Sequence, residues 1–167
     1  MSAAATELRR FRFSLDACAT PENAKCGRYF TEVGYFDDTR EETQFTPGVD
    51  GLTGNWQNQR VWCNPPFSDI MSWVDKAWSS EAELVVMLVP ATRTEQGWWQ
   101  DLVEPYRDGN HHWIGMAYDH DEKLPHGWGT FRVQFLRKRT RFLKDGKPMG
   151  SPKFGCCLLI WHRIRRH

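Results

Sequence analysis

The residues Asn64-Pro65-Pro66-Phe67 can together bind an amino group attached to a flat ring. Two consecutive prolines fix φ and remove two backbone donors, which leaves carbonyl oxygens free to accept hydrogen bonds. A residue before a proline prefers extended geometry, which presents the side-chain oxygen of Asn64. This oxygen and the Pro65 carbonyl can each accept one N–H of an exocyclic amine while Phe67 stacks on the ring. The motif indicates chemistry at such an amine, although a strand ending in a Pro-Pro turn before a buried aromatic residue has the same four letters.

The flanking residues place this motif on a loop between a strand and a helix. Arg60–Cys63 is a short strand that leads into the loop, and Asp69–Ser79 has apolar residues at helical spacing. Ser68 and Asp69 are residue types that cap helix N-termini. Open α/β sheets bind their ligands on loops of this kind. We therefore expect Asn64–Phe67 to line a binding site.

Other segments of the first two thirds favour an α/β domain. Glu83–Pro90 is a continuous apolar run closed by proline, which predicts a strand buried on both faces of a parallel sheet. Thr94–Val103 predicts the helix that follows, and Phe11–Leu15 alternates like a strand. Thr20–Arg28 predicts a short helix or turn because a proline follows a capping threonine. Residues 31–58 show no convincing period, and we interpret them as a long loop.

The last third of the chain is predicted to be rich in strands. The expected strands are Trp113–Ala117, Thr130–Leu136, Arg141–Lys144 and Cys156–Trp161, with a hairpin turn at Asp145-Gly146-Lys147.

Positive charge is concentrated in the same part of the chain. Residues 131–167 contain 11 lysines and arginines against one acidic residue, a net charge of +10, whereas residues 1–130 carry −9. The basic residues are densest at Arg137, Lys138, Arg139 and Arg141. Phe131, Phe135, Phe142 and Phe154 interleave with the charges of the whole stretch. Such mixtures suit nucleic acid. Charged residues that protect a strand edge from aggregation are the alternative interpretation.

Length and composition limit the class of protein. A chain of 167 residues, 40% hydrophobic and 26% charged, suits a single globular domain spanning 1–167. It has no apolar run long enough to cross a membrane and no signal-peptide pattern at its start, so we expect a cytoplasmic protein. Five cysteines without a Cys-x-x-Cys pair argue against a disulfide framework and a zinc site, and favour reduced thiols.

Histidines and tryptophans leave further possibilities. The spacing of His111, His112, His120 and His126 matches no metal-ligand template, so we expect no metal and assign these histidines to a solvated loop or a target-recognition surface. Among nine tryptophans, Trp62 directly precedes Cys63-Asn64 and could line the same pocket or belong to the core. The tryptophans that we expect to pack helices are Trp73, Trp78, Trp98 and Trp99.

The order of these segments resembles the phage-type DNA N-6-adenine methyltransferases from Phe11 to Trp161. The resemblance rests on Leu15-Asp16-Ala17-Cys18-Ala19, Asp50-Gly51-Leu52 with Trp56, Asn64-Pro65-Pro66-Phe67, Val89-Pro90-Ala91 and the basic stretch from Phe135 to Gly155. The chain differs from that family in three respects. It lacks an upstream Thr-Pro segment, which leads us to expect weaker cofactor binding; Glu32–Val49 looks inserted; and Lys138 stands where members often have glycine.

The resemblance implies a fold and a reaction. The fold would be an α/β, Rossmann-like sheet of an S-adenosylmethionine-dependent methyltransferase, followed by a basic β-rich C-terminal part. The enzyme would transfer a methyl group from S-adenosylmethionine to the exocyclic amine of adenine in double-stranded DNA. The resemblance implies catalytic roles for Asn64, Pro65, Pro66 and Phe67. Cofactor binding is expected from Asp16, Ala17, Cys18, Asn23 and Asp50. DNA binding is expected from Arg137, Lys138, Arg139 and Arg141.

Two alternative functions stay open from the residues. A methyltransferase acting on another planar NH2 group, such as a glutamine side chain in a protein, would use the same motif. A DNA-binding module that has lost catalysis would keep the basic stretch. The oligomeric state, the DNA recognition sequence and the biological role in protection from restriction, mimicry or regulation do not follow from the sequence.

Overall fold

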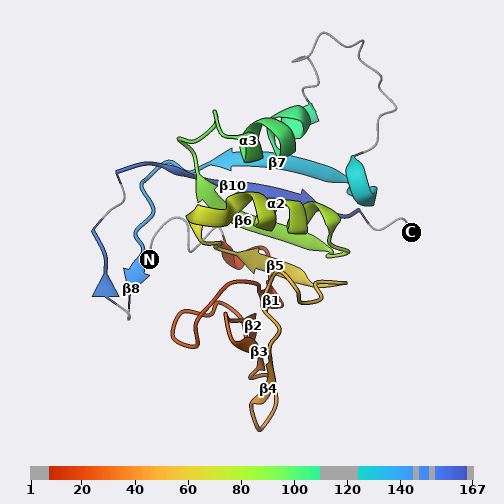
Figure 1. Ribbon diagram of the computed structural model, residues 1–167, viewed down its shortest axis with the longest axis vertical. Coiled ribbons are helices and arrows are strands. Elements are labelled where there is room, and N and C mark those ends of the chain that lie inside the picture. Colours follow the sequence, from red (N-terminus) through yellow and green to blue (C-terminus); the bar gives the residue numbers. More distant parts are fainter. Residues whose placement is uncertain (1–7, 110–123, 145–146, 151–152, 165–167) are drawn as a thin grey trace.

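One eight-stranded mixed sheet forms the centre of the protein in a computed structural model that describes residues 8–109, 124–144, 147–150 and 153–164 (Figure 1). The strand order is β4-β3-β2-β1-β5-β6-β10-β7. These strands are β1 (Leu15–Asp16), β2 (Arg28–Phe30), β3 (Gly34–Asp37), β4 (Gln44–Pro47), β5 (Arg60–Cys63), β6 (Leu84–Pro90), β7 (Thr130–Phe135) and β10 (Cys156–His162). A separate hairpin pairs β8 (Leu143–Lys144) with β9 (Lys147–Pro148).

The helices are short and lie between the strands. They are η1 (Phe67–Asp69), α2 (Ile70–Ser79), α3 (Gly97–Leu102), η2 (Glu104–Gly109) and η4 (Pro125–Gly127), where η marks a 3-10 helix. Among the described residues, no helix is long and apolar enough to span a bilayer.

The middle of the sheet is parallel and both of its flanks are antiparallel. β1 pairs in parallel with β2 and β5, and β5 pairs in parallel with β6. Every residue of β6 is buried, which confirms the prediction of a core strand at Glu83–Pro90. The expected parallel environment holds on one side only, because β10 pairs antiparallel with β6 and separates it from β7.

Both faces of the sheet carry apolar cores. α2 and α3 cover one face, where Trp73, Trp78, Trp98 and Trp99 are buried, as predicted. The other core includes Trp62, whose ring centroid lies 5.8 Å from that of Phe13. Trp62 is therefore a core residue on the face away from the helices.

Three element boundaries differ from those predicted. The strand expected at Phe11–Leu15 is confined to Leu15–Asp16, because Arg12 has a φ of 47° that breaks the extended run. α3 begins at Gly97 rather than Thr94, since Gln96 is extended and its N–H instead closes a turn onto the Arg93 carbonyl. The helix α2 begins at Ile70, and Asp69 at its N-cap makes no side-chain capping bond.

The interpretation of 31–58 as a long loop is wrong, because this segment contains β3 and β4. They extend the sheet beyond β2 as an antiparallel hairpin. Rings on successive strands hold it together: Tyr29 stacks on Phe36 at 5.1 Å, and Phe36 contacts Phe45 at 4.6 Å. All four residues of β4 are exposed at the sheet edge, so this strand has no apolar alternation for the sequence to reveal.

The C-terminal strands are confirmed in part. β7 and β10 match the predicted strands, but the strand predicted at Arg141–Lys144 is reduced to β8, which pairs with β9 and not with the strand that begins at Cys156. Thr20–Arg28 forms a turn, with the N–H groups of Asn23 and Ala24 bonded to the Thr20 carbonyl. The predicted strand 113–117, three of the four histidines (111, 112 and 120) and residues 145–146 of the predicted turn lie outside the described residues.

Candidate active site

A cavity of about 960 Å³ opens where the parallel strands β1 and β5 end. One half of its wall comes from the residues after β1, from β2 and β3 and from the turn at Asp50. The other half comes from the loop after β5, from helix α2 and from the C-terminal segment. The first half comprises Ala17, Cys18, Ala19, Thr20, Pro21, Asn23, Phe30, Thr31, Glu32, Val33, Phe36, Asp50 and Gly51, and the second Asn64, Pro65, Pro66, Phe67, Trp73, Phe142, Met149, Gly150 and Phe154.

The Asn-Pro-Pro-Phe loop presents free acceptors to this cavity. The carbonyl of Pro66 accepts the Asp69 N–H at 3.2 Å and so begins η1. Within the described part of the chain, the side chain of Asn64 and the carbonyl of Pro65 have no hydrogen-bond partner. Asn64 is half-buried and Pro65 is buried, and both residues line the cavity wall. Two acceptors beside the half-buried ring of Phe67 are what an aromatic amine requires.

Asp16 lies behind the cavity wall and holds the turn that forms it. The side chain is 2% exposed, and its two carboxylate oxygens accept the Cys18 N–H at 3.3 Å and the Lys25 N–H at 2.9 Å. Burial raises the pKa of Asp16 to about 6, against the lowering effect of these two backbone bonds. Asp16 therefore shapes the wall, and the residues that face the cavity are its neighbours Ala17 and Cys18.

Asn23 and Cys18 line the same half of the cavity, Asn23 with its amide engaged in a turn and Cys18 with a protonated thiol. Asn23 is exposed, and its side-chain oxygen accepts the Thr20 N–H at 2.8 Å, which tightens the turn. Burial raises the pKa of Cys18 to about 11, and nearby Asp16 raises it further, so this thiol stays protonated and is no nucleophile. All five cysteines are free thiols, as predicted.

Asp50 closes its own turn at the edge of the cavity. Its carboxylate accepts the N–H groups of Leu52 and Thr53 and the Thr53 hydroxyl. These bonds, chiefly that from the Thr53 N–H, hold the pKa of Asp50 below its usual range. The turn is fixed to the rest of the domain by the Trp56 indole, which donates to the Gly51 carbonyl at 2.9 Å.

Gly51 brings this turn into contact with the end of β1. A Cβ at this position would collide with the Ala17 carbonyl oxygen and lie 2.7 Å from the Trp73 ring. We expect Gly51→Ala to destabilise the protein by about 1–3 kcal/mol and to weaken ligand binding in the cavity, because backbone must move. Urea denaturation measures the first effect. Gly155→Ala is the matched control, since nothing lies within 4 Å of its added Cβ; equal stability of both variants would contradict the packing argument.

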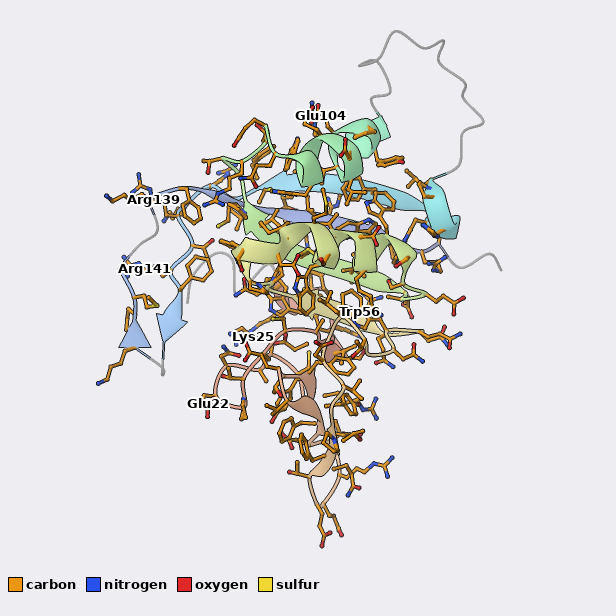
Figure 2. The ribbon with its side chains drawn as sticks, in the orientation of Figure 1. Glu22, Lys25, Trp56, Glu104, Arg139 and Arg141 are labelled. Carbon is orange, nitrogen blue, oxygen red and sulfur yellow. The ribbon has the colours of Figure 1, made fainter. Side chains whose placement is uncertain are left out.

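The predicted basic residues are exposed on the segment that joins β7 to β8. Arg137, Lys138, Arg139 and Arg141 are all exposed. Figure 2 shows Arg139 and Arg141 beside β8, on the same side of the molecule as Glu22 and Lys25 of the turn after β1. The basic segment therefore lies at the cavity side of the sheet, on a connection and not at a strand edge.

Several residues of the cavity wall were not predicted from the sequence. Thr31, Glu32, Val33 and Phe36 belong to the segment interpreted as a loop. The rings of Phe142 and Phe154 are far from Phe67 in the sequence, yet each has its centroid 6.0 Å from that of Phe67. The phenylalanines noted among the basic residues were the available signal for the last two. Across the described residues, no cluster of three or more His, Cys, Asp or Glu side chains could hold a metal ion.

Comparisons with known proteins identify the family. No curated protein matches the chain. Residues 3–151 match the family described as DNA N-6-adenine-methyltransferase (Dam). This match covers most of the 167 residues, including both halves of the cavity wall up to Gly150. The chain belongs to the DNA N-6-adenine-methyltransferase family and is an enzyme that methylates the exocyclic amine of adenine in DNA.

Proposed function

We propose that the cavity binds both reactants of this methyl transfer. The half formed by Ala17, Cys18, Asn23 and Asp50, with Asp16 behind it, would hold S-adenosylmethionine. The half formed by Asn64–Phe67 would hold an adenine taken out of double-stranded DNA. The observation that carries the proposal is a pair of acceptors beside an aromatic ring in one cavity. These are the Asn64 side chain and the Pro65 carbonyl, which have no hydrogen-bond partner among the residues that the structure describes.

The sheet supports a Rossmann-like interpretation. From β1 the chain continues outward through β2, β3 and β4, and then returns to β5 on the opposite side of β1. In open α/β sheets, ligands bind at the carboxyl ends of the strands where the strand order reverses in this way. The cavity wall includes the residues that follow both β1 and β5. We propose that the protein is a Rossmann-like methyltransferase with a basic C-terminal part, and that residues 1–167 form one domain.

The residues of the first half fit S-adenosylmethionine. Small side chains at Ala17 and Ala19, together with Gly51, leave room for a flat nucleoside. The carboxylates of Glu32 and Asp50 supply negative charge for a cationic sulfonium compound, and the lowered pKa of Asp50 keeps that group ionised. When bound, the cofactor would supply the methyl group.

The acceptor loop would activate the adenine amine by position. The lone pair of this nitrogen is delocalised into the ring, which makes it a poor nucleophile. Hydrogen bonds to the Asn64 oxygen and the Pro65 carbonyl favour a more tetrahedral nitrogen and aim its lone pair. Because the transfer is a direct displacement, most of the rate gain comes from alignment. Extrusion of the base costs a few kcal/mol, of which stacking on Phe67 returns about 1–3 kcal/mol.

The basic segment would bind the phosphate backbone. Arg139 and Arg141 are exposed on the cavity side, so their replacement by alanine should weaken binding to all duplex sequences alike. Each lost phosphate contact reduces the slope of log K against log salt by about 0.9, so the double variant should lose about 2. Fluorescence anisotropy at a series of salt concentrations measures this slope. Arg40→Ala, on the hairpin of β3 and β4, is the control; an equal change there would contradict the assignment.

The reaction is tested with radiolabelled S-adenosylmethionine and duplex DNA from cells that lack adenine methylation. After digestion to nucleosides, we expect label in N6-methyl-2′-deoxyadenosine. Label in glutamine of a protein substrate would favour the alternative methyltransferase. Tight DNA binding without any transfer would indicate a module that has lost catalysis. Sequencing of methylated positions in DNA from expressing cells would then give the recognition site.

We also propose a setting for the enzyme. The resemblance to phage-type relatives favours a protein that acts in the cytoplasm of a host cell and modifies DNA there. Protection of that DNA from restriction is the role that this chemistry serves most directly. Comparing the restriction sensitivity of phage DNA made with and without the enzyme tests this role.

A further inference from the structure

Three phenylalanines from two distant parts of the chain meet at the cavity. Phe67 follows the two prolines, whereas Phe142 and Phe154 flank the hairpin of β8 and β9. The ring of Phe142 is nearly perpendicular to that of Phe67, at 80°, and the ring of Phe154 is inclined at 56°. All three are half-buried. A flat base stacked on one ring of such a corner meets the other ring with its edge.

The two additional rings are anchored to different parts of the fold. Phe154 is next to Gly155, whose carbonyl accepts the Ala91 N–H at 2.9 Å and so fixes this position to the end of β6. The carbonyl of Phe142 accepts the Met149 N–H at 2.8 Å, which closes the β8–β9 hairpin. Phe142 also follows Arg141 directly. One ring is therefore next to a position bonded to the sheet, and the other belongs to the segment that carries the basic residues.

We propose that Phe142 is a base-binding residue that forms, with Phe67, a corner for the extruded adenine, while Phe154 is the fixed wall behind them. This inference rests on the proposed adenine site at Asn64–Phe67. It adds that base capture and phosphate binding share one segment: Arg139 and Arg141 would engage the backbone, while Phe142, whose ring already lies at the cavity wall beside Phe67, would contact the extruded base.

The test uses the full-length protein and a duplex that carries the recognition site obtained by sequencing. Phe142→Ala should lower the single-turnover rate on this duplex about tenfold or more, because a base-stacking contact is lost. Kd for S-adenosylmethionine should stay within about twofold. A second duplex, in which the target adenine faces an abasic site, should restore the rate to within about threefold of wild type. Extrusion costs least for an unpaired base, so the lost contact matters less there.

Control variants separate this role from a structural one. Phe135→Ala removes a ring that is 57% exposed on β7 and lies outside the cavity wall, and it should leave both rates unchanged. Phe142→Leu keeps the apolar bulk without the ring. Its single-turnover rate should also fall on the paired duplex and recover on the abasic duplex, with a smaller loss than for Phe142→Ala. This variant provides the test if the alanine variant unfolds. Equal losses on both duplexes, or full activity of both Phe142 variants, would overturn the proposal. Asn64→Ala is measured on the same duplexes. Full activity of that variant would show that the adenine site itself is wrong, whereas its loss of activity beside fully active Phe142 variants would overturn only the role of Phe142.

Discussion

Asn64→Ala is expected to lower the single-turnover rate of methyl transfer by about 100-fold or more, while Kd for duplex DNA changes by no more than about threefold. The Asn64 side chain has no hydrogen-bond partner among the described residues and faces the cavity, so the fold does not depend on it. Its oxygen would act on the reacting nitrogen, where one preorganised hydrogen bond is worth about 10²–10³ in rate. Phosphate contacts made elsewhere set most of the DNA affinity.

The measurement combines rapid-quench transfer from labelled S-adenosylmethionine with anisotropy binding of the same duplex. Ser68→Ala is the matched control, because Ser68 is exposed on the same loop and does not line the cavity. It should keep the wild-type rate. Parallel losses of rate and DNA affinity in Asn64→Ala would assign Asn64 to DNA binding and remove it from the chemical step.

Asp16→Asn is expected to remove one component of the pH dependence of stability, a loss of stability as the pH rises from about 4 to 7. The folded-state pKa of Asp16 is raised to about 6 from the ordinary 3.8, so folding favours the protonated carboxyl. The stabilising contribution is complete below about pH 4 and is lost as the pH rises through 6. The free energy of unfolding of wild type, relative to the asparagine variant, should therefore fall by about 3 kcal/mol between pH 4 and 7. Urea denaturation followed by tryptophan fluorescence measures this difference.

Asp50→Asn is the comparison, because the contribution of Asp50 to stability should change with pH in the opposite direction. Hydrogen bonds lower the pKa of Asp50 in the folded state, so its contribution is present at neutral pH and is lost as the pH falls. Relative to this second variant, wild type should become less stable toward acid. Parallel pH profiles for the two variants would show that burial does not control the ionisation of Asp16.

The loop that we propose as the acceptor site could be placed from sequence because its conformation depends on four consecutive residues. The conformational limits of Pro65 and Pro66 are local, so the expected loop after Arg60–Cys63 and before α2 is also what the structure contains. β6 was equally clear, since a strand buried throughout needs an unbroken apolar run. Local rules were sufficient in both cases.

Features that depend on distant pairing could not be predicted in the same way. β4 is exposed along its whole length, and its sequence has nothing that separates it from a loop. The position of Asp16 behind the wall depends on the N–H of Lys25, which a turn returns to the end of β1. Phe142 joins Phe67 only because β10 returns the chain to the sheet beside β6. Each of these contacts is fixed by topology.

The place of β10 between β6 and β7 also determines when the protein can fold during synthesis. β10 pairs along its length with β6 on one side and with β7 on the other, so these two strands do not contact each other. Residues up to 135 can leave the ribosome without completing the sheet, because the strand that joins its two parts is made last. Contacts of this sequence separation form slowly. We therefore expect the nascent chain to need protection from aggregation until residue 162 has emerged.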